Sequence, residues 1–356
     1  MKKFFGIVLA VAALASCTNT SKAKFTISGE NEKFAGKYAY LQVEQNRELV
    51  TVDSVAVAGN AFTLEGVAEE PYVAYVAIKE AGAERPELFT QLYVEPANIA
   101  IRVIEGEKRP SLVAIGGNLN SIVDQINNYL SELEELMKSE DKSVAAAAEK
   151  SWVNTMFEAI KGCKGNLVAQ TLLKSNYYNF APQQVLDAIA TMPENKQEDF
   201  ANMKKSAEQA LKVQPGNKYI DIVDNTPEGK ELSLKSVIEN KKNKYVLIDF
   251  WASWCGPCMR EVPYLVETYK NYHKKGFEIF GVSFDRTKEA WVKAIEEKKL
   301  TWPHVSAVKA WDNQARHDYA VNSIPANFLV DCSTGEIIAV SLRGEQVQAK
   351  IEELLK

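Results

Sequence analysis

The chain has 356 residues, of which 46% are hydrophobic and 25% are charged. A chain of this length and composition can form two or three domains, each with its own hydrophobic core. Its 42 Lys and Arg residues against 47 Asp and Glu residues give a net charge of -5, which argues against a nucleic acid as the partner.

The N-terminus has the pattern of a bacterial lipoprotein signal. A basic start precedes a short apolar segment at residues 4–14, and residues 14–17 form the sequence Leu-Ala-Ser-Cys, a lipobox. We predict that residues 1–16 are a signal peptide removed before Cys17, and that Cys17 is then lipidated. Residues 17–23 would form a short polar tether. The alternative is an ordinary cleaved signal in which the cysteine occurs by chance.

The expected location follows from this signal. The apolar segment is shorter than a typical membrane-spanning helix. Several acyl chains on Cys17 give stable anchoring, whereas a single chain gives only marginal binding. We therefore expect a soluble body in the periplasm, lipid-anchored at Cys17 to the inner or the outer membrane.

Residues 24–117 have the pattern of short β-strands. Apolar and polar residues alternate in short runs, which lie at residues 25–28, 38–43, 50–55, 61–64, 72–76 and 99–103. Gly59 and Asn60 between two of these runs are a hairpin-turn signal, so we predict a small antiparallel β domain. The segment shows no nucleophile, metal cluster or phosphate-binding loop.

Residues 118–213 have a helical pattern instead. One apolar stripe consists of Ile122, Ile126, Leu130, Leu133 and Leu136, and it continues in residues 144–160, 167–173 and 185–211. Such stripes more often pack in a core than form a recognition surface. The functional alternative is a spacer, or a surface through which the chain forms a homodimer.

Residues 214–217, with the sequence Gln-Pro-Gly-Asn, mark the boundary to a third region at 216–356. Strands alternate there with helices, which indicates an α/β domain with a mixed central sheet covered on both faces. The predicted strands are residues 219–222, 245–248, 277–280, 328–330 and 337–340, and a helix at 347–355 closes the chain.

Cys255 and Cys258 are separated by Gly256 and Pro257, and they lie between a predicted strand and a predicted helix. Two cysteines at this spacing can cycle between a dithiol and a disulfide. At a helix N-terminus, unpaired N–H groups and the helix dipole lower the pKa of a thiol, so Cys255 is the predicted nucleophile. Cys258, one turn further in and more buried, is the predicted resolving thiol. Pro257 is tolerated in a first helical turn because its missing N–H would lack a partner there.

Other uses of the cysteines are alternatives to this redox pair. A structural zinc site would need two more ligands, and the remaining candidates form no second close pair. These candidates are Cys163, Cys332, His273, His304 and His317. A peroxidatic cysteine would be expected to have Thr or Ser three residues earlier, where this chain has Ala252. A disulfide between Cys163 and Cys332 is a further alternative in an oxidising compartment. We expect no metal and no organic cofactor.

Residues 249–258, with the sequence Asp-Phe-Trp-Ala-Ser-Trp-Cys-Gly-Pro-Cys, resemble the active-site strand and turn of the thioredoxin superfamily. Trp254 beside the first cysteine belongs to this match. Residues 323–325 resemble the family's cis-proline loop, which faces the cysteine pair and offers the backbone of Ile324 to an extended substrate segment. The resemblance makes Pro325 a third site residue, and the alternative is an ordinary trans turn proline.

Asp249 lies six residues before Cys255 on an apolar predicted strand. It matches the family's buried acid, which relays a proton to and from the resolving cysteine. Burial raises the pKa of a carboxyl group toward neutrality, which such a relay requires. Gly281, on the neighbouring predicted strand, stands about where thioredoxin has a lysine near that acid. We therefore expect proton handling to differ from that of thioredoxin.

Two further stretches narrow the resemblance. Residues 260–263 and 276–291 are similar to exported oxidoreductases of the TlpA and ResA type. Residues 52–54, 59–62 and 116–118 resemble a β domain of unknown function that often precedes a thioredoxin-like module in such lipoproteins.

The resemblance implies a membrane-anchored thiol-disulfide oxidoreductase that acts on disulfide-containing exported proteins. The Gly-Pro dipeptide between the cysteines is that of thioredoxin, whose potential of about -270 mV is strongly reducing, and this favours reduction over oxidation. A periplasmic reductase needs electrons from a membrane partner of the DsbD or CcdA type. Two alternatives stay open at this point. One is a ligand- or partner-binding lipoprotein whose cysteine pair is a redox switch, and the other is a disulfide oxidase or isomerase.

Overall fold

The computed structural model describes residues 23–106 and 109–356. The predicted signal peptide at 1–16 and the predicted lipidation site Cys17 lie outside these residues. Within the described ranges, no helix is both long enough and apolar enough to cross a membrane.

Contacts divide the chain into two compact units. The first contains the chain up to Phe180 together with Asp187–Glu198, and the second contains Ala181–Leu186 and Asp199–Lys356. The division falls inside the region predicted to be helical. Each unit is described below by itself.

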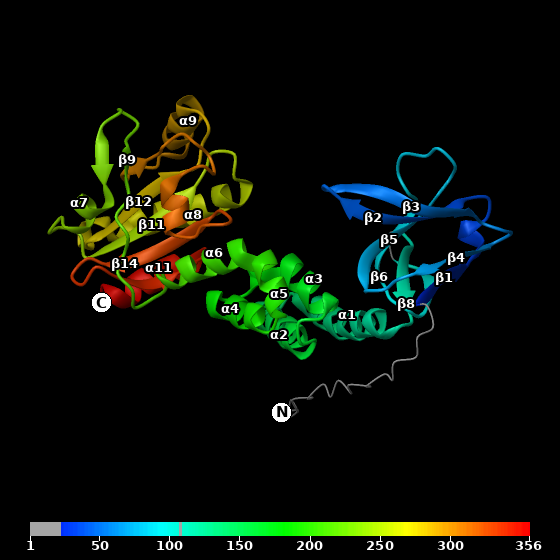
Figure 1. Ribbon diagram of the computed structural model, residues 1–356. Coiled ribbons are helices and arrows are strands. Elements are labelled where there is room, and N and C mark those ends of the chain that lie inside the picture. Colours follow the sequence, from blue (N-terminus) through cyan, green and yellow to red (C-terminus); the bar gives the residue numbers. More distant parts are fainter. Residues whose placement is uncertain (1–22, 107–108) are drawn as a thin grey trace. The chain divides into compact units, whose positions relative to one another are not determined.

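The first unit contains, in its described part, two four-stranded sheets that share one hydrophobic core (Figure 1). The strand order is β3-β2-β5-β6 in one sheet and β4-β1-β7-β8 in the other. The alternating sequence builds this core, because in β1 the buried Phe25 and Ile27 alternate with more exposed side chains. The strands are β1 (Lys24–Glu30), β2 (Tyr38–Gln45), β3 (Glu48–Ala56), β4 (Ala61–Val67), β5 (Tyr72–Lys79), β6 (Leu88–Val94), β7 (Asn98–Ile104) and β8 (Ser111–Ile115), with a short 3-10 helix η1 (Glu32–Phe34) after β1.

The predicted β domain is confirmed, but its strands differ in detail. Gly59 and Asn60 form the predicted turn, yet β3 and β4 on its two sides belong to different sheets, because a turn signal does not fix which sheet each strand joins. The pairing of β1 with β7 is parallel rather than antiparallel. Strands β6 and β8 were missed, since β8 is short and β6 contains three consecutive buried residues at 92–94 instead of an alternation.

Helices follow the sheets, as the periodicity predicted. The stripe on α1 buries Ile126 and Leu130, but Leu136 near the helix end is 49% exposed. The helical segment predicted at 185–211 is interrupted around Pro193, which lacks the N–H that a helix interior needs. The helices are α1 (Asn118–Met137), α2 (Lys142–Gly162), α3 (Leu167–Asn176), α4 (Pro182–Ala190), α5 (Glu194–Gln197) and α6 (Ala201–Leu211), with 3-10 helices η2 (Tyr177–Asn179) and η3 (Glu198–Phe200) between them.

The second unit is built around a mixed five-stranded sheet in residues 199–356, with the order β13-β12-β11-β14-β15. β11, β12 and β13 run parallel, whereas β14 pairs antiparallel with both β11 and β15. The predicted mixed α/β domain is therefore confirmed. The sheet consists of β11 (Tyr245–Trp251), β12 (Phe277–Ser283), β13 (His304–Val305), β14 (Ala326–Asp331) and β15 (Glu336–Val340).

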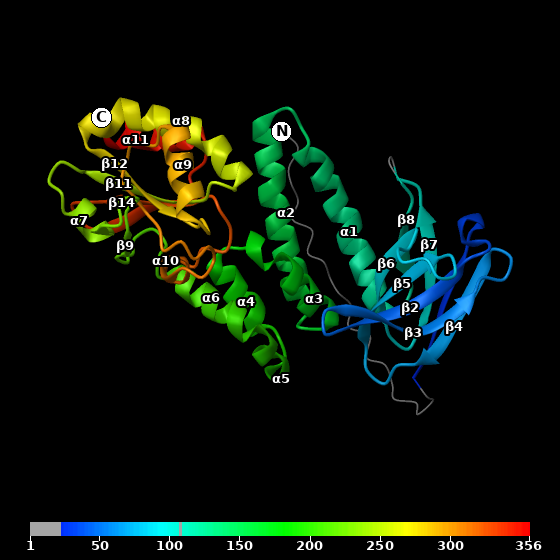
Figure 2. The same cartoon turned by 90° about the horizontal axis from the view of Figure 1, so that it is seen from above.

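Both faces of this sheet are covered. In β11, Phe250 packs against Tyr319 on one face, whereas Asp249 next to it faces the helix that contributes Glu261. Figure 2 shows α8 and α11, which pack against each other, side by side along one face. Besides α6 and the first part of α4, this unit contains the helices α7 (Leu234–Ile238), α8 (Gly256–Tyr272), α9 (Lys288–Lys298), α10 (Gln314–Asp318) and α11 (Glu345–Leu354), with η4 (His273–Lys275) after α8.

The strand predicted at residues 219–222 is not present. The backbone N–H of Ile220 donates to the Tyr319 hydroxyl at 3.1 Å, and that hydroxyl donates to the Ile220 carbonyl oxygen at 2.6 Å. A distant side chain thus satisfies the backbone groups that a neighbouring strand would otherwise bind. The strand pair that follows consists of β9 (Val223–Asn225) and β10 (Glu231–Ser233).

Candidate active site

Cys255 and Cys258 lie where β11 gives way to α8, as predicted from the sequence. Cys255 is the N-cap of α8, and its Sγ accepts a hydrogen bond from the backbone N–H of Cys258 at 3.1 Å. Pro257 is in the first helical turn, where it removes no intrahelical hydrogen bond. The two sulfur atoms form a disulfide with an S–S distance of 2.05 Å.

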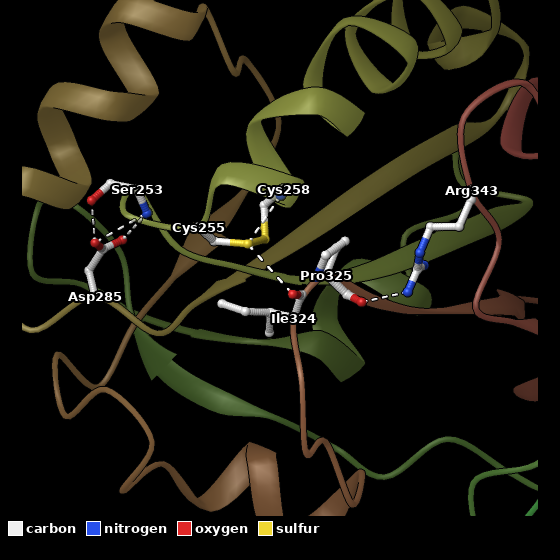
Figure 3. Close-up of a disulfide and its surroundings, with 7 residues drawn as sticks. All are labelled: Ser253, Cys255, Cys258, Asp285, Ile324, Pro325 and Arg343. Atoms are coloured by element: carbon white, nitrogen blue, oxygen red, sulfur yellow. Dashed lines mark hydrogen bonds between the residues drawn. A yellow bond between two sulfur atoms is a disulfide. The ribbon is translucent and has the colours of Figure 1, made fainter. Parts of the chain in front are cut away.

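The two cysteines are equally buried in this disulfide form, with exposed fractions of 4% for Cys255 and 3% for Cys258. The predicted difference in burial between the two cysteines is therefore not seen in this state. The loop before β14 accounts for the burial of Cys255, since the carbonyl oxygen of Ile324 lies 3.6 Å from its Sγ (Figure 3).

Pro325 follows Ile324 through a cis peptide bond, as the resemblance implied. The Pro325 carbonyl oxygen accepts a hydrogen bond from the Arg343 guanidinium at 2.5 Å (Figure 3). Arg343 follows β15 and was not singled out from the sequence. No local pattern marks it, because the contact joins residues 18 positions apart in the chain.

Asp249 is buried in β11 beneath this loop region, and its carboxyl has an unusual proton affinity. Desolvation by burial raises its pKa to about 7, the nearby Arg343 charge lowers it, and Glu261 on α8 raises it. Glu261 itself accepts a hydrogen bond from the Gly344 backbone N–H at 2.6 Å. The predicted shift toward neutrality is confirmed, and two charged neighbours that sequence reasoning missed contribute to it.

Gly281 stands directly beside Asp249 in the register of β11 and β12, and His304 stands beside Gly281 in that of β12 and β13. A Cβ atom at Gly281 would come within 2.4 Å of His304 Nδ1. Burial lowers the pKa of His304 to about 3, so its imidazole is neutral at physiological pH. Gly281, which stands about where thioredoxin has a lysine, therefore borders the neutral imidazole of His304 on the next strand. This agrees with the prediction that proton handling differs from that of thioredoxin.

Replacing Gly281 with alanine is expected to destabilise the second unit by about 1–3 kcal/mol, because the added methyl group would overlap the His304 ring. Urea unfolding of the oxidised protein measures this change. Gly256→Ala is the matched control, since a Cβ there has open space around it. Equal midpoints for Gly281→Ala and the wild type would contradict the close packing.

Ser253 and Asp285 hold the loop that leads to Cys255. The Asp285 carboxylate accepts hydrogen bonds from the Ser253 hydroxyl at 2.5 Å, from the Ser253 backbone N–H at 3.1 and 3.2 Å, and from the Ser283 hydroxyl at 2.7 Å. Asp285 lies two residues after Ser283, the last residue of β12, so the sheet fixes its place. Asp285 lies in the stretch 276–291 that resembles exported oxidoreductases, but no role for it was predicted from the sequence.

Two tryptophans form an aromatic surface beside the disulfide. Trp254 is 51% exposed, and its ring centroid lies 6.4 Å from that of the half-buried Trp311. Trp311 in turn packs edge-on against Phe284 at 5.2 Å, and the Arg316 guanidinium lies 5.5 Å from its centroid. Trp311 comes from a loop far away in sequence, so no motif pointed to it.

Cys163 and Cys332 do not take part in the disulfide. In the described part of the chain Cys163 and Cys332 are free thiols that belong to different units. Burial raises the pKa of Cys163 to about 11 and that of Cys332 to about 12, so both thiols are unreactive at neutral pH. His304 packs between Trp251 and Trp302. Residues 23–106 and 109–356 contain no cluster of three or more His, Cys, Asp or Glu side chains arranged to hold a metal ion.

Both the N-terminal β region and the C-terminal α/β region of the chain match known proteins. Residues 243–337 match the family described as "Thioredoxin-like", and residues 25–122 match a domain of unknown function (DUF4369). The thiol-disulfide oxidoreductase ResA of Bacillus thuringiensis subsp. konkukian is 34% identical over 145 residues, which cover 41% of this chain and 79% of the relative. The chain belongs to the thioredoxin-like thiol-disulfide oxidoreductases.

A second curated relative agrees with this assignment, and one solved structure is reported beside it. ResA of Geobacillus thermodenitrificans is 32% identical over 144 residues, 40% of this oxidoreductase and 79% of the relative. A crystal structure of the thioredoxin domain of a thiol-disulfide oxidoreductase from Bacteroides vulgatus is 37% identical and covers 40% of this chain and 99% of that domain, with a TM-score of 0.37. The N-terminal match also confirms the predicted β domain of unknown function.

Proposed function

We propose that this oxidoreductase reduces disulfide bonds of exported proteins in the periplasm, using Cys255 as the nucleophile and Cys258 as the resolving thiol. The observation behind this proposal is the position of the two cysteines at the start of α8. Cys255 caps the N-terminus of α8, where the Cys258 N–H points at its sulfur and the helix dipole favours a negative charge. Both effects lower the pKa of the Cys255 thiol in the reduced enzyme.

In the first step, the disulfide of the substrate is exchanged for a mixed disulfide with the enzyme. The Cys255 thiolate attacks a sulfur of the substrate disulfide, that bond breaks, and the departing substrate sulfur leaves as a thiolate that takes up a proton. The product is a mixed disulfide between Cys255 and the substrate. The Ile324 carbonyl, 3.6 Å from Cys255 Sγ, belongs to the backbone that we propose binds an extended substrate segment at this stage.

The second step closes the enzyme disulfide. Cys258 passes its proton to the Asp249 carboxylate and attacks Cys255 Sγ, so the mixed disulfide breaks and the second substrate thiol is released. Two electrons have then moved from the enzyme dithiol to the substrate. A carboxyl whose pKa is about 7 can accept and return this proton near neutral pH.

The aromatic surface supplies the other part of substrate binding in this proposal. Replacing Trp311 with alanine is expected to raise KM for a protein disulfide about tenfold, because tryptophans are often among the few residues that dominate binding energy. We expect kcat to stay within about twofold, since Trp311 is not one of the reacting groups. Initial-rate kinetics measure both constants.

Trp152→Ala provides the matched control, because Trp152 is also half-buried but belongs to the first unit. A Trp311→Ala enzyme with unchanged KM would remove Trp311 from the substrate surface.

The direction of transfer is tested by the redox potential of the Cys255/Cys258 couple. Equilibration of the full chain with glutathione buffers, followed by thiol labelling, gives this value. A potential near that of thioredoxin, about -270 mV, supports reduction of substrates, whereas one near about -120 mV would make the protein an oxidant and overturn the proposed direction.

We propose further that lipidation at Cys17 holds the protein on a membrane, where a donor of the DsbD or CcdA type returns two electrons to the pair. The lipobox at residues 14–17 supports this location. Cys17→Ser is expected to move the protein from the membrane fraction to the soluble fraction. Retention of the variant in the membrane fraction would contradict an acyl anchor at this residue.

A further inference from the structure

Asp285 is an almost fully buried carboxylate, 1% exposed, that the reaction described above does not use. Its hydrogen bonds end on the loop that carries the proposed nucleophile. We propose that Asp285 is a positioning residue that fixes the loop before Cys255, and that its negative charge keeps the Cys255/Cys258 couple on the reducing side. This inference rests on the proposed function and names a residue that sets its direction.

The hydrogen bonds determine where the loop can lie. Ser253, two residues before Cys255, gives both its backbone N–H and its hydroxyl to the Asp285 carboxylate. Binding by backbone and side chain together leaves Ser253 little freedom to rotate or shift. Because the chain between Ser253 and Cys255 is a single residue, the position of Cys255 at the start of α8 depends on this bond pair.

Asp285 is itself held from several sides. Its second carboxylate oxygen accepts from the Ser283 hydroxyl at 2.7 Å, and its backbone N–H donates to the same hydroxyl at 3.0 Å. The Ser306 hydroxyl donates to the Ser283 carbonyl oxygen at 3.0 Å, and the Asp285 carbonyl oxygen accepts from the Ala310 N–H at 3.3 Å. Asp285 is therefore held rigidly, and it joins the loop before Cys255 to the loop that carries Trp311.

A carboxylate suits this place better than a neutral group. An ionised carboxylate only accepts hydrogen bonds, and each of the groups around it, the Ser253 N–H and the two serine hydroxyls, can donate. Hydrogen bonds to a charged acceptor are about twice as strong as neutral ones. The network thus keeps a charge in the protein interior close to the redox pair.

The sign of the electrostatic effect follows from the reduced state. The buried charge of Asp285 repels the thiolate that forms at Cys255 and so opposes the effect of the helix N-terminus. A stabilised thiolate would favour the reduced enzyme and make the couple more oxidising. Figure 3 shows Asp285 on one side of the disulfide and Arg343 on the other, so the cation does not lie between the carboxylate and the sulfur.

Asp285→Asn in the full chain tests this inference, because it keeps an oxygen acceptor for Ser253 and removes the charge. The equilibrium constant for reduction of the disulfide by glutathione is expected to rise at least about tenfold, equivalent to about 30 mV. The pKa of the Cys255 thiol, followed by thiolate absorbance in the reduced enzyme, should fall. An equilibrium constant within about twofold of the wild type would overturn the role of the charge.

Ser253→Ala tests the positioning separately, since it keeps the charge of Asp285 and removes the hydrogen bond from the Ser253 hydroxyl. We expect the rate of attack by reduced enzyme on a small disulfide to fall at least about threefold, with an equilibrium constant within about twofold of the wild type. An unchanged rate would overturn the positioning role, even if Asp285→Asn did not fold.

Asp331→Asn is the matched control. Asp331 also accepts hydrogen bonds from the backbone N–H and hydroxyl of a serine, Ser333, but it pairs with Tyr245 at the opposite end of β11. That end is about 20 Å from the cysteines, given about 3.3 Å for each strand residue. We expect no change in potential or rate, and a shift equal to that of Asp285→Asn would show that the effect is not local. A wild-type potential near about -120 mV would instead reject the proposed direction alone, whatever the variants do.

Discussion

Replacing Cys255 with serine is expected to abolish disulfide reduction, with a loss of at least about 1000-fold in kcat/KM. The thiolate is the group that attacks a disulfide, and a hydroxyl at the same N-cap position does not ionise at neutral pH. Reduction of insulin by the full chain, with dithiothreitol as the electron source, measures the loss. Full activity in Cys255→Ser would contradict the assignment of the nucleophile.

Cys258→Ser separates the two roles of the pair. Cys255 can still attack, but nothing resolves the mixed disulfide, so the variant should accumulate a covalent complex with substrate that gel electrophoresis without reductant detects. Cys332→Ser is the matched control, because Cys332 is a free, half-buried thiol in the same unit. It should retain wild-type rates.

Replacing Asp249 with asparagine is expected to slow the second step about 100-fold, since an amide cannot accept the proton of Cys258. The wild-type rate of this step should rise as the pH increases through about 7, where the Asp249 carboxyl loses its proton. The asparagine variant should lack that rise. Rapid-mixing kinetics of single turnovers across pH measure the step directly, and an unchanged pH profile in Asp249→Asn would contradict the relay.

Asp249→Asn slows the reaction, but it should stabilise the folded protein at alkaline pH. The pKa of Asp249 is raised in the folded state, from an ordinary 3.8 to about 7, so the folded protein binds the proton more tightly than the unfolded chain. The contribution of this carboxyl to stability therefore falls as pH rises from about 4 through about 7, by on the order of 4 kcal/mol. Asp249→Asn should not show this fall and should be the more stable protein at pH 8. Denaturant unfolding at pH 5 and pH 8 tests the sign.

Local sequence signals predicted the chemistry and its immediate surroundings. Cys255 and Cys258 lie within one helical turn, so their spacing alone defines their geometry. The strand before them was predicted from its apolar residues, and the structure buries all of residues 246–251. Pro325 lies far from the pair in sequence, and the role of Asp249 is not visible in its own segment. Only the resemblance to a known fold therefore predicted that both belong to the site.

Long-range contacts account for what the sequence did not predict. Arg343, Glu261 and Asp285 reach the site through folding across separate elements, and each is an ordinary charged residue in its own segment. Residues 219–222 have a strand pattern, yet the Tyr319 hydroxyl satisfies the backbone there. In the first unit, the Gly59 turn was recognisable, but the sheet that each flanking strand joins depends on partners elsewhere in the chain.

The turn between β15 and α11 has a consequence for where the catalytic module ends. The family match stops at residue 337, yet Arg343 binds the Pro325 loop and its charge holds down the pKa of Asp249. A fragment cut at the end of the match would contain both cysteines, Asp249 and Pro325. Without the guanidinium its acid would keep its proton to a higher pH, and the optimum for turnover would move toward alkaline conditions. The functional boundary of the module therefore lies beyond its recognisable sequence, and an expression fragment meant to be active must extend past Gly344.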